Sequence, residues 1–175
     1  MTDLRYPIGK FRYEADVAGT RQREWIDAIA AAPAAFRAAV AGLTPAQMDT
    51  PYRPDGWTVR QVVHHVPDSH LNAYVRFKLA LTEDQPTIKP YDEARWAELS
   101  DTRTVAPAVS LDLLESLHAR WVGLLRALAA DDYRRTFHHP EHGRPLTLDE
   151  VLGMYAWHGQ HHVAHITSLR RREGW

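Results

Sequence analysis

Four histidines occur within eight residues near the C-terminal end of the chain, at positions 158, 161, 162 and 165. Helical spacing at about 100° per residue gives this segment an apolar stripe that consists of Val151, Tyr155, Ile166 and Leu169. His162 falls at the centre of the stripe and His158 in the same arc, whereas His165 lies at its edge and His161 is rotated furthest away. A buried imidazole needs a polar partner, so the fold must bring one to this helix, and a metal ion is the simplest candidate.

Two histidines four residues apart on an inward face favour a metal site more strongly than one does. A lone histidine on an apolar face is usually a core residue bonded to a carbonyl or carboxylate group. Helix geometry brings His158 and His162 together, and imidazole is the commonest metal ligand. The zinc-protease signature HExxH is absent, because Gly159 stands where its glutamate would be. This argues against that class of enzyme and removes its general base.

Periodicity predicts four long helices, at about residues 20–40, 58–81, 110–130 and from residue 147 onward. The expected N-terminal caps are Thr58 with Gln61, Ser110, and Thr147 with Glu150. Pro33 should kink the first helix or start a new turn, and Pro67 should bend the second.

The connections predict a bundle whose helices do not simply alternate in direction. A short helical turn begins at Pro45, residues 82–109 form a long crossover with a helical patch at 92–98, and residues 138–142 form a loop. No strand-like alternation competes with this pattern. Two short links and one long crossover therefore predict an all-α four-helix bundle, preceded by an extended arm through about residue 19 that packs on its body.

Composition limits the possible functions. The chain of 175 residues corresponds to a single domain, residues 1–175, and contains no cysteine, which excludes disulfides, thiolate zinc sites and cysteine nucleophiles. The formal net charge is −1 and no long basic run occurs, which argues against nucleic acid as a partner. No segment resembles a signal peptide or is long enough to span a bilayer, so we expect a cytoplasmic protein and no membrane association.

A third metal ligand has to come from another helix, and the second one offers His64, His65 and His70. Periodicity leaves His65 and His70 equally good, because the bend expected at Pro67 makes angles across it unreliable, and His64 points the other way. The histidines of the loop at residues 138–142 fit a solvated turn better than a ligand set. Asp68 fits a solvated or ligand-supporting carboxylate better than a general base.

Three neutral imidazoles leave at least one coordination position of a divalent ion open, whereas closed structural zinc sites have four protein ligands. Zinc is the default metal, and nickel, iron or manganese also accept nitrogen ligands. The open position can polarise a carbonyl group or lower the pKa of a water molecule to about 7. It can equally hold a thiol as its nucleophilic thiolate.

Two segments resemble the DinB/YfiT-like four-helix-bundle family. These are DGWTVRQVVHHVPDSH at residues 55–70 and YAWHGQHHVAHI at residues 155–166. The similarity also includes residues 6–11, 77–83, 90–93 and 137–143, and so covers nearly the whole chain. It points to the YfiT branch, and implies a metal-dependent hydrolase or, as in one branch member, a bacillithiol S-transferase.

The resemblance also implies a ligand set and partners. Its metal ligands are His65, His158 and His162, which selects His65 over His70. It implies zinc, or nickel in some cases, with a homodimer and a cytoplasmic location. Pro67 departs from the family pattern, which has alanine there.

Three functions from different classes follow. The first is an enzyme whose metal activates water, as in a hydrolase, or a low-molecular-weight thiol, as in an S-transferase, for attack on a small-molecule substrate. The second is a non-catalytic module in which the metal supports the bundle or reports metal status. The third is a protein without metal, in which the histidines are hydrogen-bonded core residues.

Overall fold

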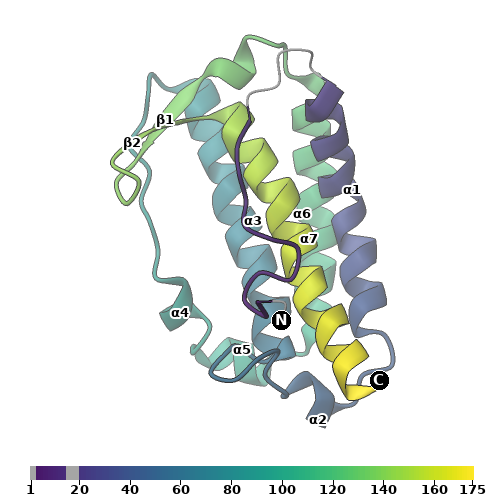
Figure 1. Ribbon diagram of the computed structural model, residues 1–175. Helices are drawn as coiled ribbons and strands as arrows, with labels where there is room; N and C mark the ends of the chain where they lie inside the picture. Colours follow the sequence, from purple (N-terminus) through teal and green to yellow (C-terminus); the bar gives the residue numbers. More distant parts are fainter. Residues whose placement is uncertain (1–2, 15–19) are drawn as a thin grey trace.

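Four long helices form the body of the protein, and the computed structural model describes residues 3–14 and 20–175 of it (Figure 1). They are α1 (Thr20–Val40), α3 (Val59–Thr82), α6 (Pro107–Ala127) and α7 (Leu148–Glu173). Helices α1 and α3 each pack against both α6 and α7. In Figure 1, α1 and α7 run in one direction and α3 and α6 in the other. The predicted four-helix bundle with non-alternating helices is confirmed.

The helix starts depend on local capping, as the sequence predicted at Thr58. The Thr58 hydroxyl accepts a hydrogen bond from the Gln61 N–H, and the Gln61 side chain accepts one from the Thr58 N–H, so the capping box is complete. Thr147 caps α7 by accepting from the N–H of Glu150. The Glu150 carboxylate pairs with Arg144 at 2.6 Å.

The cap predicted at Ser110 was wrong. Helix α6 begins three residues earlier, at Pro107, whose fixed backbone angle suits the first position of a helix. Ser110 lies inside the helix, where its hydroxyl is 2.7 Å from Nδ1 of His64. Pro33 and Pro67 are buried inside α1 and α3, and neither starts a new element.

The connections contain more structure than the sequence indicated. They include α2 (Pro45–Met48), α4 (Glu93–Trp96), α5 (Ser100–Thr104) and the 3-10 turn η1 (Asp132–Arg134). The loop expected at residues 138–142 is the end of an antiparallel hairpin of β1 (Thr136–His139) and β2 (Arg144–Thr147). Four-residue strands are too short to show a clear alternation, but Phe137 and Leu146 pair across the hairpin and are both buried. The link between α1 and α3 has the predicted length, and the link between α6 and α7, residues 128–147, is slightly longer than the predicted 131–146.

Two apolar clusters make up the core. One cluster contains the start of α3 and the end of α7, and the other contains the end of α3 and the start of α7. In α3, the first cluster ends at Val66 and the second begins at Ala73. In α7, the second cluster ends at Ala156 and the first begins with Ile166. In α7, all four histidines from His158 to His165 lie between these positions; in α3, His70 does so, and His65 lies one residue before Val66. Together these side chains form a polar layer across the bundle.

The N-terminal arm packs on α7, as predicted (Figure 1). The indole N–H of Trp157 donates to the carbonyl oxygen of Gly9 at 3.2 Å, and the Tyr13 hydroxyl donates to Asp149 at 2.8 Å. The last part of the predicted arm, residues 15–19, lies outside the described residues. No helix within the described part of the chain is long and apolar enough to cross a membrane.

The contact of α1 with α7 requires a small residue at position 153. A Cβ atom on Gly153 would lie 2.9 Å from Cζ2 of Trp25. We expect Gly153→Ala to lower the free energy of unfolding by about 1–3 kcal/mol through overpacking. Urea unfolding monitored by circular dichroism measures this.

Gly123 of α6 provides the matched control, since it is exposed and a Cβ there would meet no atom within 4 Å. Gly123→Ala should raise the free energy of unfolding by about 0.5–1 kcal/mol, because glycine disfavours a helix interior. Equal effects of the two substitutions would contradict the packing argument.

Candidate metal centre

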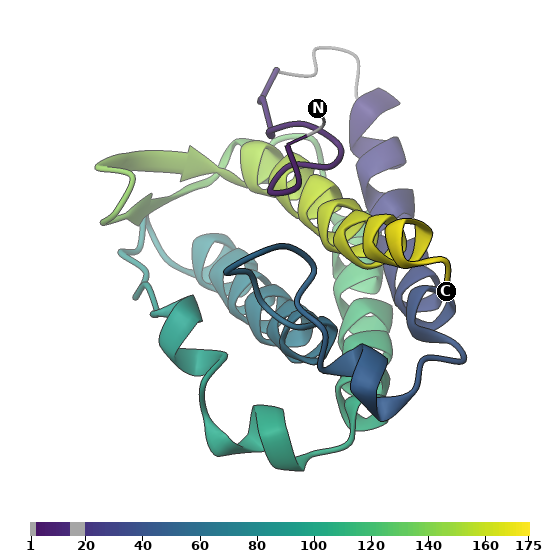
Figure 2. The same ribbon diagram turned by 60° about the horizontal axis from the view of Figure 1, so that its bottom comes forward.

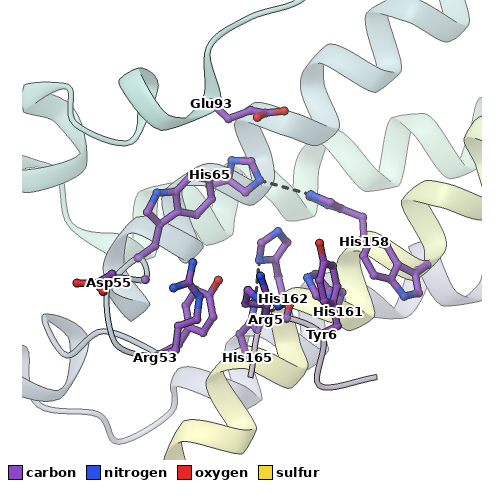
Figure 3. A pocket seen from close by; sticks show the side chains of 14 residues that line it. Arg5, Tyr6, Arg53, Asp55, His65, Glu93, His158, His161, His162 and His165 are labelled. Carbon is purple, nitrogen blue, oxygen red and sulfur yellow. Dashed lines mark hydrogen bonds between the residues drawn. The ribbon is translucent and has the colours of Figure 1, made fainter. Parts of the chain in front are cut away.

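Three histidines from two helices converge in the polar layer (Figure 3). His65 comes from α3, and His158 and His162 come from successive turns of α7. One ring nitrogen of each lies within 4.8 Å of the other two. The Nε2 atoms of His65 and His158 are 3.4 Å apart, and two nitrogens bound tetrahedrally to one zinc ion would be about 3.3 Å apart. The donor set therefore fits a divalent ion in its chemistry, and the distance between His65 and His158 fits two ligands of one ion.

Burial keeps these three imidazoles neutral. It lowers the pKa of His65 to about 4. It also lowers the pKa values of His158 and His162 well below the usual range, and the neighbouring histidines add to that effect. A neutral imidazole has a free lone pair at neutral pH, which metal binding requires.

His70, the alternative to His65, does not reach the shared point. Its Nε2 atom is 3.0 Å from Nδ1 of His158, on the side of that ring away from His65. Its Nδ1 atom is 2.8 Å from Nε2 of His118 on α6. His64 bonds to Ser110, so of the three histidines considered on α3 only His65 joins the group.

A cavity of about 710 Å³ opens beside the three histidines. Besides the α7 histidines, its walls come from the arm, from the loop before α3 and from α4, and they include Arg5, Tyr6, Tyr52, Arg53, Asp55, Trp57 and Glu93 (Figure 3). This volume suits a small molecule. The site can therefore admit a substrate next to a bound ion.

The loop before α3 lies between α3 and α7 (Figure 2). The Trp57 ring centroid is 4.6 Å from that of His65, and the Tyr52 ring stacks on His165 at 3.9 Å. These aromatic rings cover histidine faces that would otherwise meet water. The sequence reasoning did not single them out, because a loop has no periodicity that predicts which side chains turn inward.

Charged groups of both signs line the cavity. Arg5 and Arg53 are the cations, and Asp55 and Glu93 the anions. Burial raises the pKa of Glu93, with smaller contributions from nearby acidic residues. Glu93 was not singled out from the sequence either, and its position at the start of a one-turn helix in the crossover gave little signal.

His161 differs from the sequence expectation, which turned it furthest from the apolar stripe. It is buried, because the arm and α7 cover it: its ring stacks on Trp157 at 4.3 Å and on Tyr6 at 5.9 Å. The hairpin histidines, His139 and His142, pack on each other and do not line the cavity.

The surroundings of Gly159 leave no room for the glutamate that the zinc-protease signature has at this position. This residue is buried, and a Cβ atom on it would lie 3.4 Å from Cβ of Ala32 and 3.8 Å from Cε1 of His70. A longer side chain would push α7 away from α1.

A sequence profile of the DinB superfamily matches residues 28–166. The chain belongs to the DinB superfamily. A Bacillus subtilis (strain 168) relative named "Putative metal-dependent hydrolase YfiT" is 50% identical over 173 residues, which are 99% of this chain and 97% of the relative. A Bacillus cereus (strain 03BB102) relative named "Putative metal-dependent hydrolase" is 55% identical over 175 residues, the full length of both chains.

A solved structure of this superfamily has the same fold. It superposes with a TM-score of 0.95 at 50% identity, over 98% of each chain. It is YfiT from Bacillus subtilis, described as "a probable metal-dependent hydrolase with an unusual four-helix bundle topology". The recognised family and the helical bundle are thus confirmed, and the three-histidine group is where the described residues could hold a divalent metal.

The buried histidines predict that the metal-free protein is sensitive to acid. Burial lowers the pKa values of His65 and His118 from 6.5 to about 4. At pH values between 4 and 6.5, the unfolded chain binds more protons than the folded protein does. The free energy of unfolding is therefore highest above about pH 6.5 and falls as the pH decreases toward 4. Urea unfolding at about pH 7, 6 and 5 should show a loss of at least about 1 kcal/mol.

Asp68 acts in the opposite direction and supplies a control. Burial raises its pKa to about 6, so its contribution to stability is lost as the pH rises through that value. Asp68→Asn should therefore make the acid-induced loss of stability steeper. A free energy of unfolding that is equal at pH 7 and pH 5 in this variant would contradict the prediction.

Proposed function

We propose that this protein is a metal-dependent hydrolase in which His65, His158 and His162 hold one zinc ion per subunit. The observation that carries the proposal is the convergence of three neutral imidazoles, with Nε2 atoms 3.4 Å apart in His65 and His158, at the wall of an open cavity. The names of the relatives support metal dependence and hydrolysis. Nickel or another divalent transition metal would also suit three imidazoles.

When bound, a divalent ion supplies a Lewis acid that polarises a carbonyl group and promotes loss of a proton from water. Three protein ligands would leave room for one small molecule beside them, which is the pattern of catalytic rather than structural zinc sites. Trp57 and Tyr52 cover the histidine rings on one side and limit the access of bulk water. Arg5 and Arg53 can orient a substrate that carries negative charge.

Glu93 is our candidate for proton transfer. Its carboxylate lines the same cavity, and partial desolvation there raises its pKa above the usual value, which makes it a stronger base. In the proposed reaction the water oxygen bonds to the substrate carbonyl carbon while Glu93 accepts the proton of that water. The bond to the leaving group then breaks, and Glu93 returns the proton to the leaving group.

Thiol transfer to an electrophile is the alternative reaction at the same site. Ester or amide turnover without added thiol would support the hydrolase. Consumption of an electrophile only when a low-molecular-weight thiol is supplied would support the S-transferase. Zinc that only raises the melting temperature, with no turnover in either assay, would support the non-catalytic module.

The ligand set can be tested by metal content. We expect His65→Ala, His158→Ala and His162→Ala each to weaken zinc affinity at least about 100-fold, the upper end of what loss of a supporting residue costs. Elemental analysis of untagged protein and chelator competition measure this. His139→Ala, also buried but in the hairpin, is the control and should retain the metal. Full metal retention in one of the three variants would remove that residue from the set.

The role of Glu93 can be separated from metal binding. Glu93→Gln keeps the size of the side chain and removes its basic oxygen, so we expect zinc affinity to be unchanged and the turnover number to fall about 100- to 10,000-fold. Asp55→Asn, which changes the other carboxylate of the cavity, is the matched control. Equal turnover in the Glu93→Gln variant and the unmodified protein would exclude Glu93 as the base.

The partners and location implied by the family resemblance stay predictions. They are a small-molecule substrate, a homodimer and a cytoplasmic location, with neither nucleic acid nor membrane as a partner. The mass of the untagged protein in solution tests the homodimer.

A further inference from the structure

Two lines of hydrogen-bonded histidines lead away from the proposed centre, and each ends on a backbone carbonyl group. In the first, Nδ1 of His158 is 3.0 Å from Nε2 of His70, and Nδ1 of His70 is 2.8 Å from Nε2 of His118. Nδ1 of His118 is 2.7 Å from the carbonyl oxygen of Ile29. This line joins all four long helices, because its members belong to α7, α3, α6 and α1.

The second line reaches the N-terminal arm. Nδ1 of His162 is 3.3 Å from Nδ1 of His165, and Nε2 of His165 is 3.1 Å from the carbonyl oxygen of Arg5. Figure 3 shows His162 and His165 together on α7 with Arg5 beside them.

A carbonyl oxygen can only accept a hydrogen bond, whereas a neutral imidazole has one N–H donor and one acceptor nitrogen. His118 must therefore donate from Nδ1 to Ile29, which leaves its Nε2 atom as an acceptor. His70 must then donate from Nδ1 and accept at Nε2. As a result, His158 donates from Nδ1 and has its lone pair on Nε2.

The same rule fixes His162. His165 donates from Nε2 to Arg5, so its Nδ1 atom accepts. His162 then donates from Nδ1, and its lone pair is on Nε2. Both α7 imidazoles are thus held in the tautomer that leaves Nε2 unprotonated, and His158 Nε2 faces His65.

Pro33 explains why the carbonyl group of Ile29, at the end of the first line, is free to accept a hydrogen bond from His118. In a regular helix, the carbonyl of Ile29 would accept from the N–H of residue 33, four positions later. Proline has no N–H, so this carbonyl lacks its usual donor and is available to His118. The proline that the sequence marked as a possible kink thus supplies the acceptor.

Aromatic rings enclose the first line. His70 stacks on His118 with ring centroids 4.9 Å apart, and the Trp121 and Tyr155 ring centroids lie 5.8 and 5.1 Å from that of His70 in edge-to-face arrangements. His70 is 0% and His118 1% exposed. An apolar surrounding makes an unpaired ring nitrogen costly, so it favours the one arrangement in which each of these nitrogens has a partner.

We propose that His70, His118 and His165 are positioning residues that fix His158 and His162 in the Nδ1–H tautomer and so direct both Nε2 lone pairs toward the point they share with His65. The relevance of these lone pairs to metal rests on the proposed function, whereas the tautomers themselves do not. Loss of a positioning residue frees the ligand ring to take the opposite tautomer, whose Nε2–H cannot bind metal.

The first test measures zinc affinity by chelator competition in His70→Phe, His118→Phe, the double variant and His165→Phe. Each single change should weaken affinity about 10- to 100-fold. The double variant should bind zinc no more weakly than His70→Phe does, because His118 acts only through His70. If the two substitutions were independent structural defects, their losses of affinity would multiply. His64→Phe on α3 is the control, since this buried histidine bonds to Ser110 outside both lines, and its zinc affinity should be unchanged.

The second test needs no variant and no metal. Nitrogen NMR of the metal-free protein near pH 7 distinguishes a protonated ring nitrogen from an unprotonated one, and we expect Nδ1–H for His158, His162, His70 and His118, and Nε2–H for His165. An Nε2–H tautomer at His158 or His162, or zinc affinity in His118→Phe equal to that of the unmodified protein, overturns the proposal. If the unmodified protein binds no zinc, the proposed function is wrong, but the NMR measurement still tests whether His158 and His162 are held in the Nδ1–H tautomer.

Discussion

The burial of a histidine layer between two apolar clusters is the constraint on which the rest of this structure depends. Each imidazole there has two nitrogens to satisfy, and the low-polarity surroundings offer few partners. The partners come from every long helix and from the arm, so the positions of these elements are tied to one another. A bundle with only apolar side chains in this layer could slide or repack, whereas hydrogen bonds of defined direction allow few alternatives.

Much of the bundle could be predicted because its signals are local. The apolar period and the capping residues place α1 at residues 20–40 and the start of α3 at Thr58. The four-residue spacing of His158 and His162 predicted that they act as a pair, since helix geometry alone decides that contact. The choice between His65 and His70 was not local, because it depends on how α3 is rotated against α7, and the family resemblance selected the one that joins the group.

The rest of the site depends on contacts between residues far apart in the chain, which leave no period in the sequence. Glu93 and Trp57 reach the cavity from connecting segments. His118 gave no signal as a single histidine among the leucines of α6, and its role depends on a carbonyl group 89 residues earlier in α1. The hairpin was missed for a different reason, since its strands are only four residues long.

The N-terminal arm contributes both a wall of the cavity and the acceptor for His165, and this has a thermodynamic consequence. If docking of the arm favours the form of His162 that binds a cation, then occupation of the centre must favour docking of the arm to the same extent, by reciprocity. Docking of the arm and binding of a cation at the centre would then be two linked equilibria. Such a protein could register whether its centre is loaded by how firmly residues 3–14 are held on its surface.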